Sequence, residues 1–143
     1  MKKEIRTKIL IAASPEKVWS ILTDFKNYPN WNPFIKSLTG EVAVGKTIVA
    51  KLSPPNSSAM TFKPKVLVFD KNKEFCWLGN LFFRGLFDGE HKFELKDNQD
   101  GTTTLIQSEK FSGILVPFLA KMLDTNTVEG FKLMNQKLKE LAE

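Results

Sequence analysis

The spacing of apolar residues changes from strand-like to helical near Pro117, and this change restricts the possible folds more than any other feature. Between residues 35 and 112, apolar side chains recur at every second position in short runs separated by turn residues, which is typical of β-strands. From about Pro117 onward they recur at helical steps. The connections between the strand runs are too short for crossover helices, so the sequence predicts an antiparallel α+β fold.

The most regular alternation covers residues 87–95. One face carries Phe87, Gly89, His91, Phe93 and Leu95, and the charged residues between them occupy the other face. A turn is predicted at 97–101, and residues 102–111 return as the next strand. Residues 3–11 alternate in the same way and predict a half-buried first strand.

The first helix is predicted to start at Ser14. Its hydroxyl can cap the helix, Pro15 suits the first helical position, and Glu16 favours the positive end of the helix dipole. Pro29 and Pro33 predict that the segment 27–33 does not stay helical, because a proline disfavours helix at the residue before it.

A long C-terminal helix is predicted from a single apolar stripe, formed by Leu119, Leu123, Phe131, Met134, Leu138 and Leu141. Two small residues, Thr127 and Gly130, interrupt the stripe. Glycine inside a helix costs up to about 1 kcal/mol relative to alanine. Gly130 therefore indicates close packing or clearance for a pocket.

Composition and charge suit one domain over residues 1–143. The single cysteine, Cys76, cannot form an internal disulfide, and neither a signal peptide nor a membrane span is visible, so we expect a cytoplasmic protein. The net charge of +5 is spread along the chain. It predicts a solvated surface, or else weak attraction to anionic lipid headgroups or RNA. We expect no specific nucleic-acid partner, at most transient contact with a membrane surface, and a monomer or weak dimer.

Several kinds of chemistry are disfavoured by the residue inventory. With one histidine and one cysteine, a metal site or a nucleophilic triad has too few suitable side chains. The glycines at 40, 45 and 79 are isolated, so no phosphate-binding loop is expected. We therefore expect no cofactor.

A series of short segments along the whole chain resembles the START-like (SRPBCC, polyketide cyclase/dehydrase) superfamily. The segments are 13–19 (ASPEKVW), 22–25 (LTDF), 28–34 (YPNWNPF), 62–64 (FKP), 77–79 (WLG), 87–95 (FDGEHKFEL), 107–113 (QSEKFSG) and the pairs at 130–131, 134–135 and 138–139. The resemblance implies a helix-grip fold of bacterial type. In it, a curved antiparallel sheet of about seven strands wraps around the C-terminal helix, with two short helices after the first strand. The resemblance also implies an apolar pocket between sheet and helix, but no catalytic motif of the superfamily maps onto this chain.

Three polar residues are predicted to face the concave side of the sheet. If Phe93 points inward, strand alternation carries His91 inward with it, and Phe111 on the next strand carries Gln107 and Glu109. Buried polar groups need partners, so these three should meet each other, water or a ligand. Three readings remain open for His91 and Glu109: a structural pair, the site for a ligand's polar end, or a general acid and base.

The leading interpretation is a protein that binds or transports a hydrophobic or amphipathic small molecule, such as a lipid, a quinone or an aromatic metabolite. The alternatives are a polyketide cyclase/dehydratase-like enzyme that uses His91 and Glu109, and a co-chaperone-like interaction module. The predicted ligand-binding residues are Trp31, Phe34, Phe62, Trp77, Phe82, Phe87, His91, Phe93, Gln107, Glu109, Phe111, Leu123, Thr127 and Phe131. The neighbouring Phe83 and Phe118 are further candidates for lining the pocket or its mouth.

Overall fold

The computed structural model of the chain describes residues 2–81 and 83–143. Along this part of the chain the elements are β1 (Lys2–Ile11), α1 (Pro15–Leu22), a 3-10 turn η1 (Phe25–Asn27), α2 (Tyr28–Trp31), β2 (Ile35–Thr39), β3 (Val49–Leu52), β4 (Met60–Phe62), β5 (Lys65–Asp70), β6 (Glu74–Asn80), β7 (Asp88–Asp97), β8 (Thr103–Ser112), α3 (Val116–Met122), a π-helical turn η2 (Leu123–Thr127) and α4 (Val128–Ala142). The predicted α+β class is confirmed.

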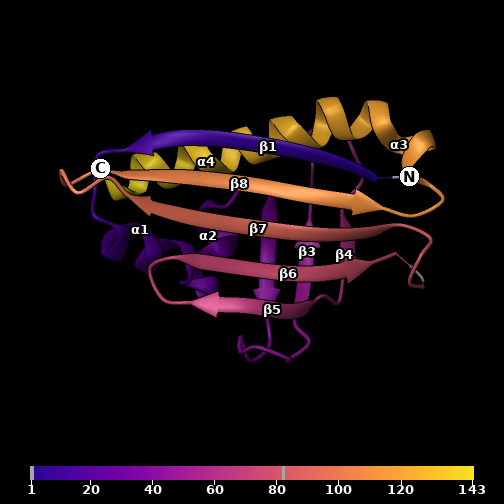
Figure 1. Cartoon of the computed structure of the whole chain (residues 1–143), viewed down its shortest axis with the longest axis horizontal. Helices are drawn as coiled ribbons and strands as arrows, with labels where there is room; N and C mark the ends of the chain where they lie inside the picture. The colour runs from indigo at the N-terminus through magenta and orange to yellow at the C-terminus, as the bar shows by residue number, and fades with distance from the viewer. Residues whose placement is uncertain (1, 82) are drawn as a thin grey trace.

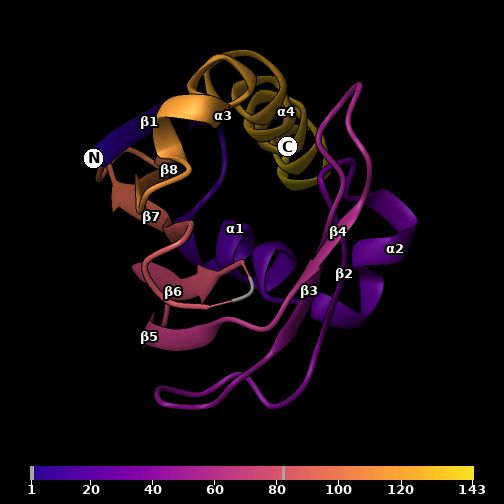
Figure 2. The same ribbon diagram turned by 90° about the vertical axis from the view of Figure 1, so that its right-hand side faces the viewer.

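The described strands form two antiparallel sheets. The larger sheet has the order β1-β8-β7-β6-β5, so the first strand joins the last one, and the smaller sheet has the order β2-β3-β4. Figure 1 shows the larger sheet with α4 lying behind β1 and β8. Viewed from its end, the molecule has the two sheets on opposite sides and the C-terminal helix across the gap between them (Figure 2). This is the predicted helix-grip arrangement.

Phe62, Val66 and Val68 alternate with residues 63, 65 and 67 in the sequence, which predicts one strand, but the structure has two strands here. β4 ends at Phe62 and pairs in the smaller sheet, whereas β5 begins at Lys65 and pairs in the larger one. Pro64 lies between them and has no N–H to donate to a ladder. This break is one reason why the described strands number eight, where the resemblance implied about seven.

The start of α1 is confirmed at the atomic level. The backbone N–H of Lys17 donates to the Ser14 hydroxyl oxygen at 3.2 Å, and Pro15 and Glu16 occupy the first turn. The prediction for 27–33 was wrong in part, because Tyr28–Trp31 form one helical turn. Pro29 is tolerated there because it lies in the first turn, where its missing N–H would have no intrahelical partner.

The C-terminal helix is interrupted by the π-helical turn η2, which the sequence reading did not anticipate. In the apolar stripe Leu123, Phe131, Met134 and Leu138 are buried and Leu119 is half-buried, whereas Leu141 is 43% exposed and Ala142 is buried next to it. Gly130 is explained by close packing. A β-carbon there would lie 2.5 Å from the ring of Phe34, which is itself buried. Among the described residues, no helix is long and apolar enough to cross a membrane.

Candidate functional site

A cavity of about 320 Å³ lies between the two sheets and the C-terminal helical segment. Its wall comes from β3, β4 and the 53–58 loop on one side, from β6, β7 and β8 on the other, and from α3 and η2. The described lining residues are Phe34, Ala50, Leu52, Pro54, Ser57, Ser58, Met60, Phe62, Trp77, Gly79, Leu81, Phe87, Gly89, Glu109, Phe111, Leu119, Met122, Leu123 and Thr127. Glu109 is the one ionisable residue among them, so an almost wholly apolar space holds a single carboxyl group.

Eight of the residues predicted to bind a ligand line this cavity, namely Phe34, Phe62, Trp77, Phe87, Glu109, Phe111, Leu123 and Thr127. Phe87, which directly precedes β7, and Phe111 on β8 stack on each other with ring centroids 5.5 Å apart. Strand alternation therefore located most of the aromatic wall on the sheet side.

The other predicted residues are placed elsewhere. Trp31, Phe93 and Phe131 are buried but do not line the cavity. His91 and Gln107 lie behind Glu109, again buried. The prediction for Phe82 falls outside the described residues, and Phe83 and Phe118 are exposed to solvent rather than lining the cavity.

The sequence reading missed the lining residues of the smaller sheet and of the helix. Ala50 and Leu52 are two positions apart and so share one strand face, but nothing in their spacing indicates that this face meets the cavity. Leu119 belongs to the predicted helical stripe and lies one turn before Leu123, which is the sequence feature that could have indicated its place in the cavity wall. The 53–58 loop contributes Pro54, Ser57 and Ser58, and it is tied to the helical side where Asn126 donates to the Ser57 hydroxyl at 3.3 Å.

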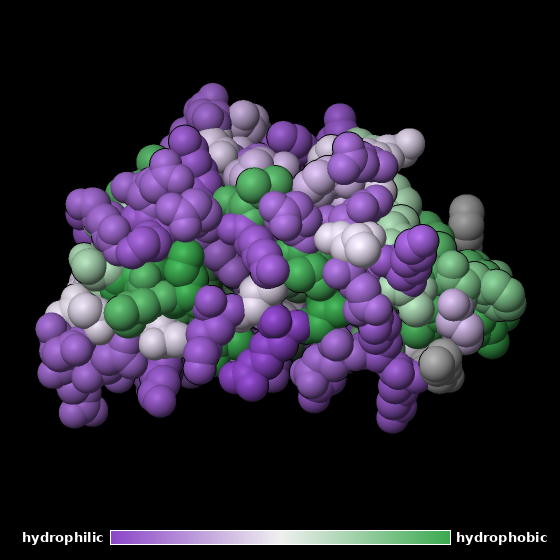
Figure 3. Space-filling view, turned by 90° about the horizontal axis from the view of Figure 1, so that it is seen from above, coloured by the Kyte–Doolittle hydropathy of each residue, from purple (hydrophilic) through white to green (hydrophobic). Residues whose placement is uncertain are grey.

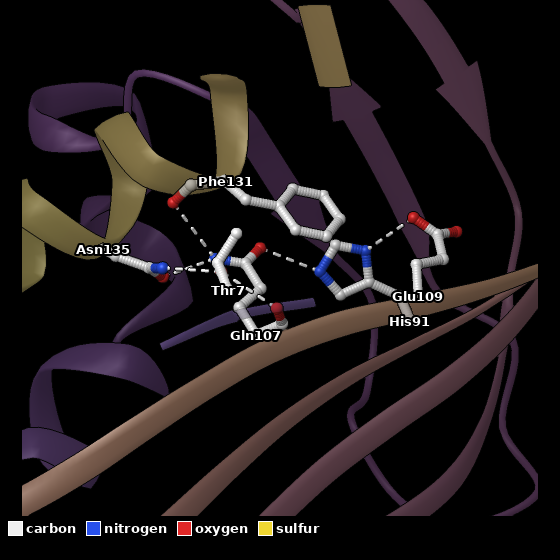
Figure 4. Close-up of polar contacts among 6 residues, drawn as sticks. All are labelled: Thr7, His91, Gln107, Glu109, Phe131 and Asn135. Atoms are coloured by element: carbon white, nitrogen blue, oxygen red, sulfur yellow. Dashed lines mark hydrogen bonds and ion pairs between the residues drawn. The ribbon is translucent and has the colours of Figure 1, made fainter. Parts of the chain in front are cut away.

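A continuous chain of hydrogen bonds leads from the helix to the cavity wall (Figure 4). His91 Nδ1 lies 3.2 Å from Glu109 Oε1, and His91 Nε2 lies 2.9 Å from Gln107 Oε1. Gln107 Nε2 donates to Asn135 Oδ1 at 2.7 Å, and Asn135 Nδ2 donates to the Thr7 hydroxyl oxygen at 2.8 Å. The three polar residues predicted to face inward do meet, and Asn135 and Thr7 extend the network.

Aromatic rings hold the imidazole of His91 in place. Its centroid lies 4.9 Å from that of Trp77, 4.8 Å from that of Phe93 and 4.8 Å from that of Phe131. The ring is completely buried. Both ring nitrogens are therefore confined to the hydrogen bonds that they make with Glu109 and Gln107.

Gly89 creates the space for the carboxyl group of Glu109. A β-carbon at position 89 would lie 2.2 Å from Oε2 and 3.2 Å from Cδ of that side chain. Both residues line the cavity. The absence of a side chain at 89 thus lets an ionisable group lie at the surface of an apolar space.

An exposed apolar tip, defined here as Phe83, Ile114 and Phe118, lies next to the cavity wall. The exposed fractions of these residues are 61%, 67% and 82%. Hydrogen bonds join their two segments, since Ile114 N–H donates to the Gly85 carbonyl oxygen at 3.2 Å. Figure 3 shows apolar residues gathered at the end of the molecule where α3 lies.

The ionisable groups at the site are the His91 imidazole and the Glu109 carboxyl group. Among the described residues, no group of three or more histidine, cysteine, aspartate and glutamate side chains converges. The paired imidazole and carboxyl group could exchange a proton with a bound molecule, because Glu109 touches the cavity.

Comparison with known proteins gives a consistent picture of the fold. The zhui aromatase/cyclase from Streptomyces sp. R1128 superposes with a TM-score of 0.79 at 12% identity, over 99% of this chain and 94% of that one. Norcoclaurine synthase from Thalictrum flavum, in a complex with dopamine and hydroxybenzaldehyde, superposes with a TM-score of 0.73 at 14% identity, over 99% of this chain and 86% of that one. A START superfamily protein from Mycobacterium smegmatis superposes with a TM-score of 0.73 at 21% identity, over 96% of this chain and 98% of that one.

The sequence comparison identifies the family directly. No curated protein matches the chain. The family model described as polyketide cyclase / dehydrase and lipid transport matches residues 2–143, which is almost the whole length. Together with the two sheets gripping a C-terminal helix, this match shows that the chain belongs to the polyketide cyclase/dehydrase and lipid transport family of the START/SRPBCC superfamily.

Proposed function

We propose that this protein binds a hydrophobic or amphipathic small molecule in the cavity, without transforming it. The observation that carries the proposal is the cavity itself: about 320 Å³, lined by apolar side chains and one carboxyl group. Small-molecule sites have volumes of roughly 300–1,000 Å³ and combine an apolar wall with few polar groups. A dry cavity of ~300 Å³ would cost about 7 kcal/mol of stability, which favours an occupant.

The experiment compares the natural chain with a variant whose cavity is filled. Ala50 is buried in β3 and lines the cavity, so Ala50→Phe puts a ring into the ligand space. Leu133→Phe on the exposed face of α4 adds the same ring without touching the cavity. We expect displacement of a fluorescent apolar probe by aliphatic and aromatic compounds in the natural chain and in Leu133→Phe, and loss of probe binding in Ala50→Phe.

Ligand binding should also stabilise the fold. A ligand at a hundred times its Kd raises the free energy of unfolding by about 2.7 kcal/mol when it binds only the folded state. We expect the melting temperature to rise with ligand in the natural chain but not in Ala50→Phe. Equal probe binding by both variants would show that the cavity is not the site.

An enzymatic role is the second candidate, and the contact between His91 and Glu109 is the observation that favours it. Glu109 reaches the cavity and its partner imidazole is held at 3.2 Å, so the pair could act as acid and base on a polyketide-like substrate. His91→Gln separates the candidates. Turnover that disappears while binding persists supports the enzyme, and unchanged binding with no turnover in the natural chain supports the binder.

Transient contact with a membrane surface is a further part of this proposal. The apolar tip is exposed beside the cavity wall, and Arg84 and Lys121 are exposed in the same two segments. Apolar side chains flanked by basic ones favour anionic bilayers. We expect Phe118→Ser to reduce co-sedimentation with phosphatidylserine vesicles, whereas Leu141→Ser, at the other end of the helical segment, should leave it unchanged. Equal effects would argue against docking through the tip.

A further inference from the structure

The hydrogen-bond network behind the cavity determines which atoms donate and which accept. The Thr7 hydroxyl donates to the main-chain carbonyl oxygen of Gln107 at 2.9 Å, because a carbonyl can only accept. The Thr7 oxygen must therefore accept from the amide nitrogen of Asn135, which lies 2.8 Å away. This orients the Asn135 side chain and leaves its Oδ1 as an acceptor.

The same reasoning continues to the histidine. Asn135 Oδ1 accepts from Gln107 Nε2 at 2.7 Å, and the carbonyl oxygen of Phe131 lies 3.5 Å from the same nitrogen. Two acceptors face this atom, so it is the amide nitrogen of Gln107. The other end of that amide, Oε1, is then an acceptor 2.9 Å from His91 Nε2, which must carry a hydrogen.

One proton is shared between His91 Nδ1 and Glu109 Oε1. These atoms lie 3.2 Å apart, and without a proton between them a lone pair would face a carboxylate oxygen in a buried space. The proton belongs either to the imidazole, beside a carboxylate, or to Oε1, beside a neutral imidazole. The pair is electrically neutral in both cases, and Oε2 carries no hydrogen in either.

Oε2 is therefore an acceptor that faces the ligand space. Figure 4 shows it directed away from His91, and its neighbour Gly89 has no side chain to cover it. Among residues 2–81 and 83–143, no donor lies within hydrogen-bonding distance of Oε2. The Glu109 side chain is 11% exposed and lines the cavity, so a bound molecule that excludes water from Oε2 loses affinity unless it donates a hydrogen bond there.

From this we propose that the cavity selects an apolar molecule whose polar end is a hydroxyl group, an alcohol or a phenol, over one that ends in a carboxylate. A hydroxyl donates to Oε2 and adds no charge to the apolar space. A carboxylate offers only acceptors and would bring a net negative charge next to the neutral pair. This inference rests on the proposed binding function and specifies its ligand class.

The test uses probes that share one alkyl chain and differ only at the end. 1-Dodecanol, its methyl ether and dodecanoate at pH 7.5 are titrated against the natural chain by displacement of a fluorescent apolar probe. We expect the alcohol to bind about tenfold tighter than the methyl ether, because the ether covers Oε2 without donating a hydrogen bond to it. We expect dodecanoate to bind more weakly than the alcohol by a larger factor.

Two substitutions at Glu109 test whether Oε2 is the acceptor for the hydroxyl group. In Glu109→Gln the amide nitrogen donates to His91 Nδ1, which places an oxygen where Oε2 lay, so the preference for the alcohol over the ether should persist. In Glu109→Leu the acceptor is absent and the alcohol and ether should bind alike. Thermal unfolding establishes whether each variant folds. If Glu109→Leu does not fold, the relative affinities of the three probes for the natural chain test the selection for a hydroxyl group.

The outcomes separate this inference from the function on which it rests. If dodecanoate binds as tightly as the alcohol, or the ether equals the alcohol in the natural chain, the hydroxyl selection is wrong while small-molecule binding stands. If none of the three probes displaces the fluorescent compound, both are wrong. If Glu109→Leu still prefers the alcohol, another residue selects the hydroxyl group and the role proposed for Glu109 is wrong.

Discussion

Gly89 and Glu109 share one space: a β-carbon on the first would lie 2.2 Å from Oε2 of the second. The two residues lie on neighbouring strands, β7 and β8, and the carboxyl group rests over the bare backbone of the glycine. The position of the one ionisable side chain among the described lining residues therefore depends on a residue that makes no polar contact with it.

Gly89→Ala should turn the Glu109 side chain away from His91. The carboxyl end of glutamate is flexible, so what is lost is the hydrogen bond to the buried imidazole, and we expect the free energy of unfolding to fall by about 1–3 kcal/mol. Gly79 is the matched control because it pairs with Gly89 across β6 and β7, and a β-carbon there meets Pro64 at an ordinary 3.5 Å. Urea unfolding of both variants checks this; equal losses would contradict it.

Gly130→Ala should destabilise the protein even though alanine favours helix. The added methyl group would lie 2.5 Å from the ring of Phe34, which is packed against Phe131 and cannot move freely. Overpacking of this kind costs typically about 1–3 kcal/mol. A double-mutant cycle measures the contact: Phe34→Leu should be less harmful in the Gly130→Ala background than alone. Additive losses would mean that the ring and the helix do not compete for this space.

Asn135→Leu should weaken the fold by breaking the polar network at its centre. Gln107 Nε2 and the Thr7 hydroxyl both lose a buried partner, and each unsatisfied group costs about 1–3 kcal/mol. The exposed neighbour Gln136 provides the control, since Gln136→Leu also replaces a side-chain amide with leucine but removes no buried hydrogen bond. Thermal unfolding should show a clear loss for the first variant and almost none for the second.

Cys76 should be nearly unreactive in the folded protein at pH 8. Burial, reinforced by Glu90 and Glu74, raises the pKa of its thiol from 9.0 to about 12, so the reactive thiolate is rare. We expect labelling by an aromatic disulfide reagent to be slow in buffer and rapid in 8 M urea. Rapid labelling in buffer would show that the thiol is accessible and ionised.

The same pKa predicts how stability depends on pH. Because the folded pKa of Cys76 exceeds the unfolded one, this thiol favours the folded state below about pH 9, and the contribution is lost as the pH rises towards 12. The difference in free energy of unfolding between the natural chain and Cys76→Ala should therefore shrink across this range. A constant difference would mean that Cys76 does not titrate there.

The inward cluster could be predicted because strand alternation is a local property. His91 and Glu109 each share a face with phenylalanines, and they turn out to be direct cross-strand partners in the β7–β8 ladder. Asn135 could have been added, since it lies four residues after Phe131 on the buried face of the helix. Thr7 shares a strand face with Ile5 and Ile9, but no pattern in the sequence indicates its partner.

The wall opposite the larger sheet could not be predicted from the sequence. The smaller sheet reaches the cavity because β2–β4 fold across from β6–β8, and that placement depends on contacts between segments far apart in the chain. Gly130 suggested either packing or clearance. Only the position of the Phe34 ring decides between them, and the clearance beneath the helix belongs to Thr127 instead.

The π-helical turn η2 changes the rotation of α3 about the helix axis relative to α4. Leu119, Leu123, Thr127 and Phe131 are separated by three steps of four residues, which is more than the 3.6 residues of each α-helical turn. The wider turn at 123–127 absorbs the surplus residue. Without it, α3 would be rotated by about 100° relative to α4. A single surplus residue thus lets one continuous helical segment present Leu119 to the ligand space while Phe131 and Asn135 face the sheet.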